Sequence, residues 1–149
     1  MRGIAVVLSV GLVALATFAA DEARAVRAVR PQIVRLVLDD SSVSPATSPD
    51  FDPAIVFRML HARRPAFVGC YEREARLNDA IGEGTIALAV TLHPDSSTTA
   101  TLDSDELSQP NIASCTTRVV NGFRFVPGPA RDARFVVRLR YERPRSNEQ

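Results

Sequence analysis

The sequence predicts an α+β fold in which an antiparallel sheet carries two helices on one of its faces. Apolar residues recur with a helical period in segments 52–78 and 110–121 and alternate along the segments around them, in the order β-α-β-β-α-β. Each strand has one apolar face, which is typical of an antiparallel sheet covered on one side. Each helical segment places one cysteine on its apolar face, so the two cysteines are expected in the same layer.

Residues 1–25 have the pattern of a signal peptide. Arg2 precedes an uninterrupted apolar run from residue 4 to residue 20, which ends in small residues. Cleavage is expected after Ala25, in the small-x-small triplet 23–25, with 17–19 as a weaker alternative. A cleaved chain would lie in the periplasm or be secreted. An uncleaved run, close to the shortest span of roughly 17 residues, would instead associate with the inner membrane through residues 4–20.

The composition favours one small domain with no bias toward nucleic acid. Of 149 residues, about 124 remain after cleavage, enough for one domain with a core. The formal net charge is +1, and all 18 basic residues are arginine. A charge this close to zero does not favour a nucleic-acid partner.

Residues 26–50 are expected to form a short strand and a linker. Val34, Leu36 and Leu38 alternate with Ile33, Arg35 and Val37, which predicts the strand. Residues 40–53 are rich in Ser, Pro and Asp and show no periodicity, which is typical of a linker.

The first helix is expected over 52–78. A proline inside a helix lacks the N–H of the helical ladder, so Pro65 predicts a kink or a restart near Arg64. One face gathers the apolar residues Val56, Met59, Leu60, Phe67, Cys70, Tyr71 and Leu77.

Two paired strands should follow. Along 85–92 the apolar residues take alternate positions, and the turn residues 93–97 lead to a partner strand over 98–102 that turns Ala100 and Leu102 inward. The expected inward residues of the first of these strands are Ile86, Leu88, Val90 and Leu92.

A second helix and a last strand complete the fold. Pro110 opens the helix after an N-cap at Ser108 or Gln109, and Gly122 follows its end. Its buried face is expected to hold Ile112, Cys115, Thr116 and Val119. The last strand should turn Phe135, Val137, Leu139 and Tyr141 inward and Arg134, Val136, Arg138 and Arg140 outward.

Three roles compete for the cysteines: nucleophile, metal ligand or disulfide. His61 lies on the side of the helix opposite Cys70, and His93 is expected to be solvated beside a turn, so neither is placed as a general base. The paired spacings of zinc sites are absent from the sequence. In an oxidising compartment the expected outcome is a disulfide between Cys70 and Cys115, with two free buried thiols as the alternative.

The sequence contains none of the common catalytic motifs. Glycine-rich phosphate loops, G-x-S-x-G and H-E-x-x-H do not occur, and the carboxylates of DSDEL and DFDP fall in polar loops. We therefore expect a protein that is not an enzyme and that holds no cofactor or metal.

Four stretches resemble a known family: HARRPAFVGCYEREARL, GTIALAVTLHPD, NIASCTTRVVNGFRFVPGP and RFVVRLRYER. They are similar to the AgmX/PglI C-terminal domain, a TonB C-terminal-like module found mostly in myxobacteria. The resemblance covers roughly residues 51–143, with 144–149 left as a disordered tail. Its most specific elements are Cys70-Tyr71-Glu72 and Cys115, and it also implies that these cysteines pair.

The resemblance implies a protein-binding function in the cell envelope. TonB-like domains take up an extended peptide as an added strand at a sheet edge. We expect the edge to be the final strand, with Arg134, Val136, Arg138 and Arg140, and the partner to be an unidentified envelope protein or peptide. The alternatives are a structural accessory subunit of an envelope or gliding-motility complex, and a module that binds the cell wall through the arginines.

Overall fold

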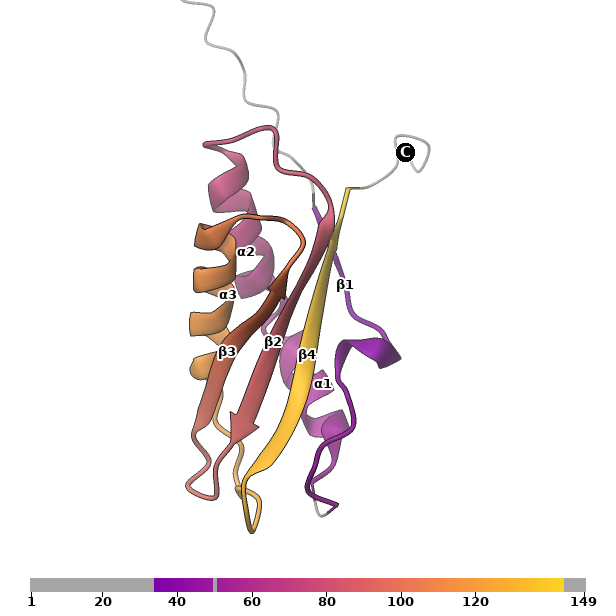
Figure 1. Ribbon diagram of the computed structural model, residues 1–149, viewed down its shortest axis with the longest axis vertical. Helices are drawn as coiled ribbons and strands as arrows, with labels where there is room; N and C mark the ends of the chain where they lie inside the picture. Colours follow the sequence, from indigo (N-terminus) through magenta and orange to yellow (C-terminus); the bar gives the residue numbers. More distant parts are fainter. Residues whose placement is uncertain (1–33, 50, 144–149) are drawn as a thin grey trace, which may run out of the picture.

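A four-stranded antiparallel sheet with helices on one face forms the protein in the computed structural model, which describes residues 34–49 and 51–143 (Figure 1). The elements in chain order are β1 (Arg35–Val37), a short 3-10 turn η1 (Asp40–Ser42), α1 (Pro53–Ala62), α2 (Arg64–Ala75), β2 (Gly84–Leu92), β3 (Thr98–Asp105), α3 (Pro110–Asn121) and β4 (Ala133–Glu142). The predicted α+β class is confirmed, and the described residues form three α-helices where the sequence suggested two.

The predicted signal peptide, 1–25, and tail, 144–149, lie outside the described residues. Within the described ranges, no helix is both long enough and apolar enough to span a membrane.

The break between α1 and α2 has the predicted cause. Asp52 caps α1 by accepting a hydrogen bond from the N–H of Ala54 at 2.9 Å. The helix ends before Arg63, and α2 begins at Arg64 with Pro65 in its first turn, where the missing N–H costs no helical hydrogen bond. The single segment expected from 52 to 78 is thus two helices, the second ending at Ala75.

The strand order is β1-β4-β2-β3, and every pair is antiparallel. β2 and β3 form the predicted hairpin, whereas β4 inserts between β2 and β1. Figure 1 shows the three helices on one side of this sheet and the other side without a helical cover.

The residues expected to face inward from the sheet form most of the core. Leu36 of β1 is buried with the expected residues of β2 and β4, which are Ile86, Leu88, Val90, Leu92, Phe135, Val137, Leu139 and Tyr141. Two expected core residues are exposed instead: Leu77, at 81%, because α2 has already ended, and Leu102, at 50%, near the end of the outer strand β3.

Residues 43–48 of the expected linker pack against the sheet. Ser44 and Thr47 donate their backbone N–H groups to the carbonyls of Val136 and Arg134, each at 2.9 Å. Val43 forms a bridge with Val137, and the Ser48 side chain is buried. The absence of periodicity in the sequence therefore reflects an irregular strand-like contact.

The predicted disulfide between Cys70 and Cys115 is present and joins α2 to α3, with a Cα–Cα distance of 5.7 Å. A second link between the same helices runs from the Asn111 side-chain amide to Glu74 Oε1 at 3.0 Å. The two helices are thus tied to each other as well as to the sheet.

Two tyrosines stack in the centre of the core. The rings of Tyr71 and Tyr141 lie 5.4 Å apart and nearly parallel. Tyr71 donates its hydroxyl to the carbonyl of Gly82 at 2.8 Å and Tyr141 donates to that of Phe67 at 3.3 Å. Burial raises the pKa of Tyr141 to about 12.

Reduction of the disulfide is expected to destabilise the fold. Cys70 and Cys115 have a sequence separation of 45, and the chain-entropy model assigns about 4 kcal/mol of unfolding free energy to a loop of this length. Urea unfolding with and without dithiothreitol measures the loss. The double variant Cys70→Ser, Cys115→Ser should not respond to dithiothreitol, and an unchanged midpoint for the wild-type protein would contradict the expected stabilisation.

Stability is expected to fall in alkaline solution because of Tyr141. Its pKa is about 12 in the folded chain against an ordinary value of 10.0. The contribution of Tyr141 to the free energy of unfolding is therefore complete below about pH 10 and is lost between about pH 10 and 12, because the unfolded chain releases the proton first. The loss is at most about 1.4 kcal/mol per pH unit. Urea unfolding across this range should show the loss in the wild-type protein, and Tyr141→Phe should remove that part of the slope.

Candidate functional site

The final strand is not an edge of the sheet, so the predicted binding edge is wrong. β4 pairs with β2 on one side and with β1 on the other, and the segment containing Ser44 and Thr47 covers the rest of its second side. Alternation identifies a strand and its two faces but carries no information on strand order. The residues assigned to the edge, Arg134, Val136, Arg138 and Arg140, therefore lie on an interior strand.

β3 is an outer strand with free backbone groups. It pairs only with β2, and the hydrogen bond from His93 N to Ser97 O, 2.9 Å, sets the phase of the hairpin. In an antiparallel ladder hydrogen-bonded and non-hydrogen-bonded pairs alternate. The backbone N–H and C=O groups of Thr98, Ala100 and Leu102 accordingly point away from β2.

Side-chain and backbone groups near the end of α3 cover the first part of this outer side. The Ala100 N–H donates to Asn121 Oδ1 at 2.6 Å, and the Thr98 hydroxyl donates to the carbonyl of Phe123 at 3.2 Å. Asn121 therefore occupies the position that a neighbouring strand would take at Ala100. Such cover over part of an edge limits unwanted strand pairing.

The uncovered part of the edge is the stretch 102–104. The outward N–H and C=O of Leu102 have no partner among residues 34–49 and 51–143, and residues 102–104 are all exposed. Past this stretch the pairing with β2 continues, because the N–H of Glu106 donates to the Thr85 carbonyl at 3.0 Å. The free backbone of this outer strand is thus confined to a short stretch.

Asp105 ends β3 with an unsatisfied carboxylate oxygen. Its Oδ2 accepts a hydrogen bond from the N–H of Gln109 at 2.9 Å. Its Oδ1 is buried and has no hydrogen-bond partner in the described part of the chain. A buried acceptor without a partner is uncommon and costly, so this oxygen lowers the stability of the end of β3.

The face of the sheet opposite the helices carries the predicted arginine row. Arg140 forms ion pairs with Asp39 at 3.4 Å and Glu142 at 3.1 Å. Hydrogen bonds from Ser41, and then the charge of Arg140, lower the pKa of Asp39. The guanidinium groups of Arg134 and Arg138 make no ion pair or hydrogen bond with any described residue. We call this surface the open face.

A chain of three polar side chains lies at one end of the open face. Asp132 Oδ1 is 3.0 Å from Nδ1 of His93, whose Nε2 is 3.0 Å from the Thr99 hydroxyl. The order of groups is that of a catalytic triad. The His93 and Asp132 side chains are 34% and 45% exposed, so water competes for these hydrogen bonds. We therefore interpret the three side chains as a structural link between the β2–β3 hairpin and the loop before β4.

The remaining sequence-predicted positions have structural roles. Both cysteines are oxidised, which removes the nucleophile and ligand readings. Within the described ranges, no group of three or more His, Cys, Asp or Glu residues is placed to hold a metal ion. Tyr71 is a core residue, whereas Glu72 is only half-buried on α2. Sequence reasoning predicted β3 as a strand but missed its position at the edge and the contact that Asn121 makes with it, because strand order cannot be inferred from the alternation of side chains.

Comparison of the chain with protein-family models, with curated proteins and with solved structures gave no significant match.

Loss of the Asn121 side-chain amide is expected to open the edge at Ala100. Asn121→Ala removes the acceptor of the Ala100 N–H, so hydrogen exchange at this amide should accelerate about five-fold, in line with the roughly 1 kcal/mol of one hydrogen bond. Amide exchange followed by NMR measures it. Asn111→Ala, which removes the link to Glu74 on the other end of α3, is the matched control. Equal exchange at Ala100 in all three proteins would show that Asn121 does not cover the edge.

Proposed function

We propose that this protein is an exported, non-enzymatic binding module of the cell envelope that takes up an extended peptide of a partner protein as a strand beside β3. The observation that carries the proposal is the uncovered, outward-facing backbone of Leu102 on an outer strand. The resemblance to the TonB C-terminal-like AgmX/PglI domain supports it, since that class binds peptides by strand addition.

The disulfide supports the compartment. Disulfides form and persist outside the reducing cytoplasm, and Cys70 and Cys115 are joined between α2 and α3 of this fold. The apolar run 4–20 supports the same compartment from the sequence. We place the protein in the periplasm or among secreted proteins, with the inner-membrane surface as the alternative if that run is retained.

The edge offers a partner a small number of strong, directional contacts. An added strand would first pair with the N–H and C=O of Leu102, each hydrogen bond contributing roughly 0.5–1.5 kcal/mol. To extend toward Ala100 it would have to displace Asn121 Oδ1. Binding would therefore begin at the free backbone of Leu102 and would extend along β3 only where the partner replaces the Asn121 side chain.

Crosslinking from β3 tests strand addition. A photo-crosslinking p-benzoylphenylalanine in place of Ser104 is expected to capture an envelope protein in cells. Adding Leu102→Pro should lower the yield at least about ten-fold, because proline removes an outward N–H while leaving the ladder to β2 intact. Leu102→Thr, which keeps the N–H, is the matched control for the change of side chain.

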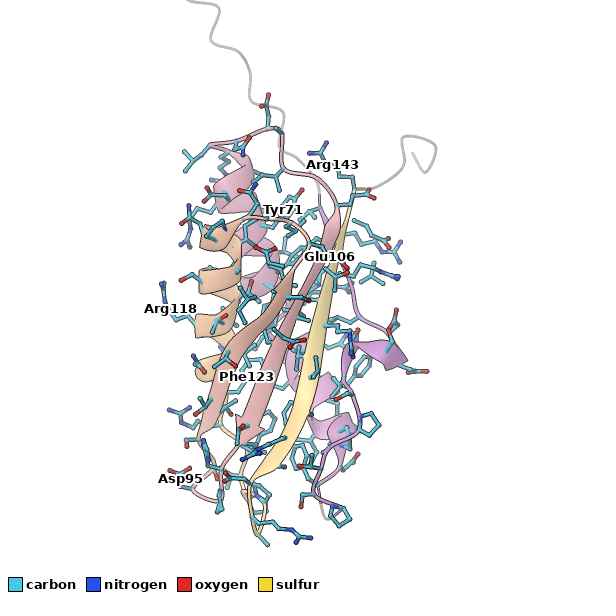
Figure 2. The ribbon with its side chains drawn as sticks, in the orientation of Figure 1. Tyr71, Asp95, Glu106, Arg118, Phe123 and Arg143 are labelled. Atoms are coloured by element: carbon cyan, nitrogen blue, oxygen red, sulfur yellow. A yellow bond between two sulfur atoms is a disulfide. The ribbon has the colours of Figure 1, made fainter. Side chains whose placement is uncertain are left out.

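A second crosslinker position separates this function from assembly through the helices. Arg118 extends from α3 away from the sheet (Figure 2), so p-benzoylphenylalanine at this position reports on the helical layer. Capture only from position 118, or an unchanged yield with Leu102→Pro in a folded protein, would reject strand addition. The first of these results would favour an accessory subunit held by its helices.

A further inference from the structure

A regular grid of side chains occupies the open face where three strands meet. Thr91 of β2 lies between Thr99 of β3 and Arg134 of β4 in the strand register. In the next row Ala89 lies between Thr101 and Val136. Directly paired side chains on one face are about 5 Å apart, so each row spans about 10 Å from β3 to β4.

This grid is the floor of an open depression of about 350 Å³. The chain at Ser44, Pro45 and Thr47 forms its wall on the β4 side. Ligand sites have volumes of about 300 to 1,000 Å³, so this depression is large enough for one amino-acid side chain with its adjoining backbone. Because it is open to solvent, a peptide can lie across it without entering a closed cavity.

Some polar groups of the depression already make hydrogen bonds within the protein, and others are free to bind a ligand. In the wall, the Ser44 and Thr47 hydroxyls accept the N–H groups of Val136 and Arg134 at 2.8 and 3.0 Å. On the floor, the Thr99 hydroxyl contacts His93. The free groups among the described residues are the guanidinium of Arg134 and the hydroxyls of Thr91 and Thr101.

The charged side chains around the depression favour an anionic ligand. Asp132 is the acidic residue closest in sequence to Arg134, and its carboxylate is held by His93 Nδ1 at 3.0 Å. Farther along β4 the unpaired Arg138 adds a second positive charge, while Asp39 and Glu142 are engaged by Arg140. A guanidinium presents paired donors that match a carboxylate, and Ala89 and Val136 offer apolar contact beside it.

We propose that the depression on the open face binds an acidic side chain of an extended peptide, with its carboxylate on Arg134, its methylene groups over Ala89 and Val136, and its backbone within reach of the Thr91 and Thr101 hydroxyls. This site lies on a sheet face, whereas strand addition uses the outer backbone of β3, so the inference does not depend on the proposed function.

NMR titration of the full-length, ¹⁵N-labelled protein tests the site. The probe is acetyl-Ala-Glu-Ala-amide, added to about 10 mM, a concentration that reveals even millimolar affinity. The expected result is a set of amide shifts at Ala89, Thr91 and Val136. Acetyl-Ala-Gln-Ala-amide, which has the same shape without the charge, should bind at least about ten-fold more weakly, as expected for the loss of a charge-assisted hydrogen bond.

Two variants assign the effect to one residue. Arg134→Gln, an exposed position, should weaken the glutamate peptide at least about ten-fold, whereas Arg118→Gln on α3 should leave its affinity unchanged. The amide spectrum of each variant shows that it is folded. Equal binding of both peptides, no shifts at these amides, or shifts that Arg134→Gln does not reduce would overturn the proposal. Inorganic phosphate that binds the same amides as tightly as the glutamate peptide would also overturn it, by revealing an unselective anion site.

Discussion

Pairing of β4 on both of its sides is the constraint on which the rest of the structure depends. It is the last of the described elements, and it joins β2 to β1, which is the first of them. Its inward side chains, among them Phe135, Leu139 and Tyr141, are buried in the core, where Tyr141 stacks on Tyr71 of α2. With β4 in the interior, β3 is left as an outer strand, and the arginines of β4 lie on a face of the sheet instead of along an edge.

The sequence predicted local features well because their causes are local. Alternation identified the inward residues of β2 and β4, Pro65 identified the break between α1 and α2, and helical phase together with an oxidising compartment identified the disulfide. Strand order was not predictable in this way, since two strands with the same pattern can take either place in a sheet. The edge assignment failed for that reason, and Leu102, which has the pattern of a core residue, is half exposed.

The candidate sites show the same division. The arginine row on β4 was visible in the sequence, but its neighbours on the open face, Thr91 and Thr99, became neighbours only through the register of three strands. Asn121 likewise has no recognisable signature, because its role comes from the position of α3 beside β3. Residue type can suggest which groups bind, whereas their grouping into a site requires the tertiary fold.

The register of β1 and β4 also determines how the domain responds to mechanical force. Arg35 lies opposite Glu142, so both ends of the described chain leave from the same end of the sheet. Tension between these ends loads the hydrogen bonds of the β1–β4 pair one after another, as in a zipper, and separates them at low force. The disulfide between Cys70 and Cys115 transmits the force directly from one cysteine to the other. The β2–β3 hairpin lies between these cysteines in the sequence, so it is not extended when β1 and β4 are pulled apart.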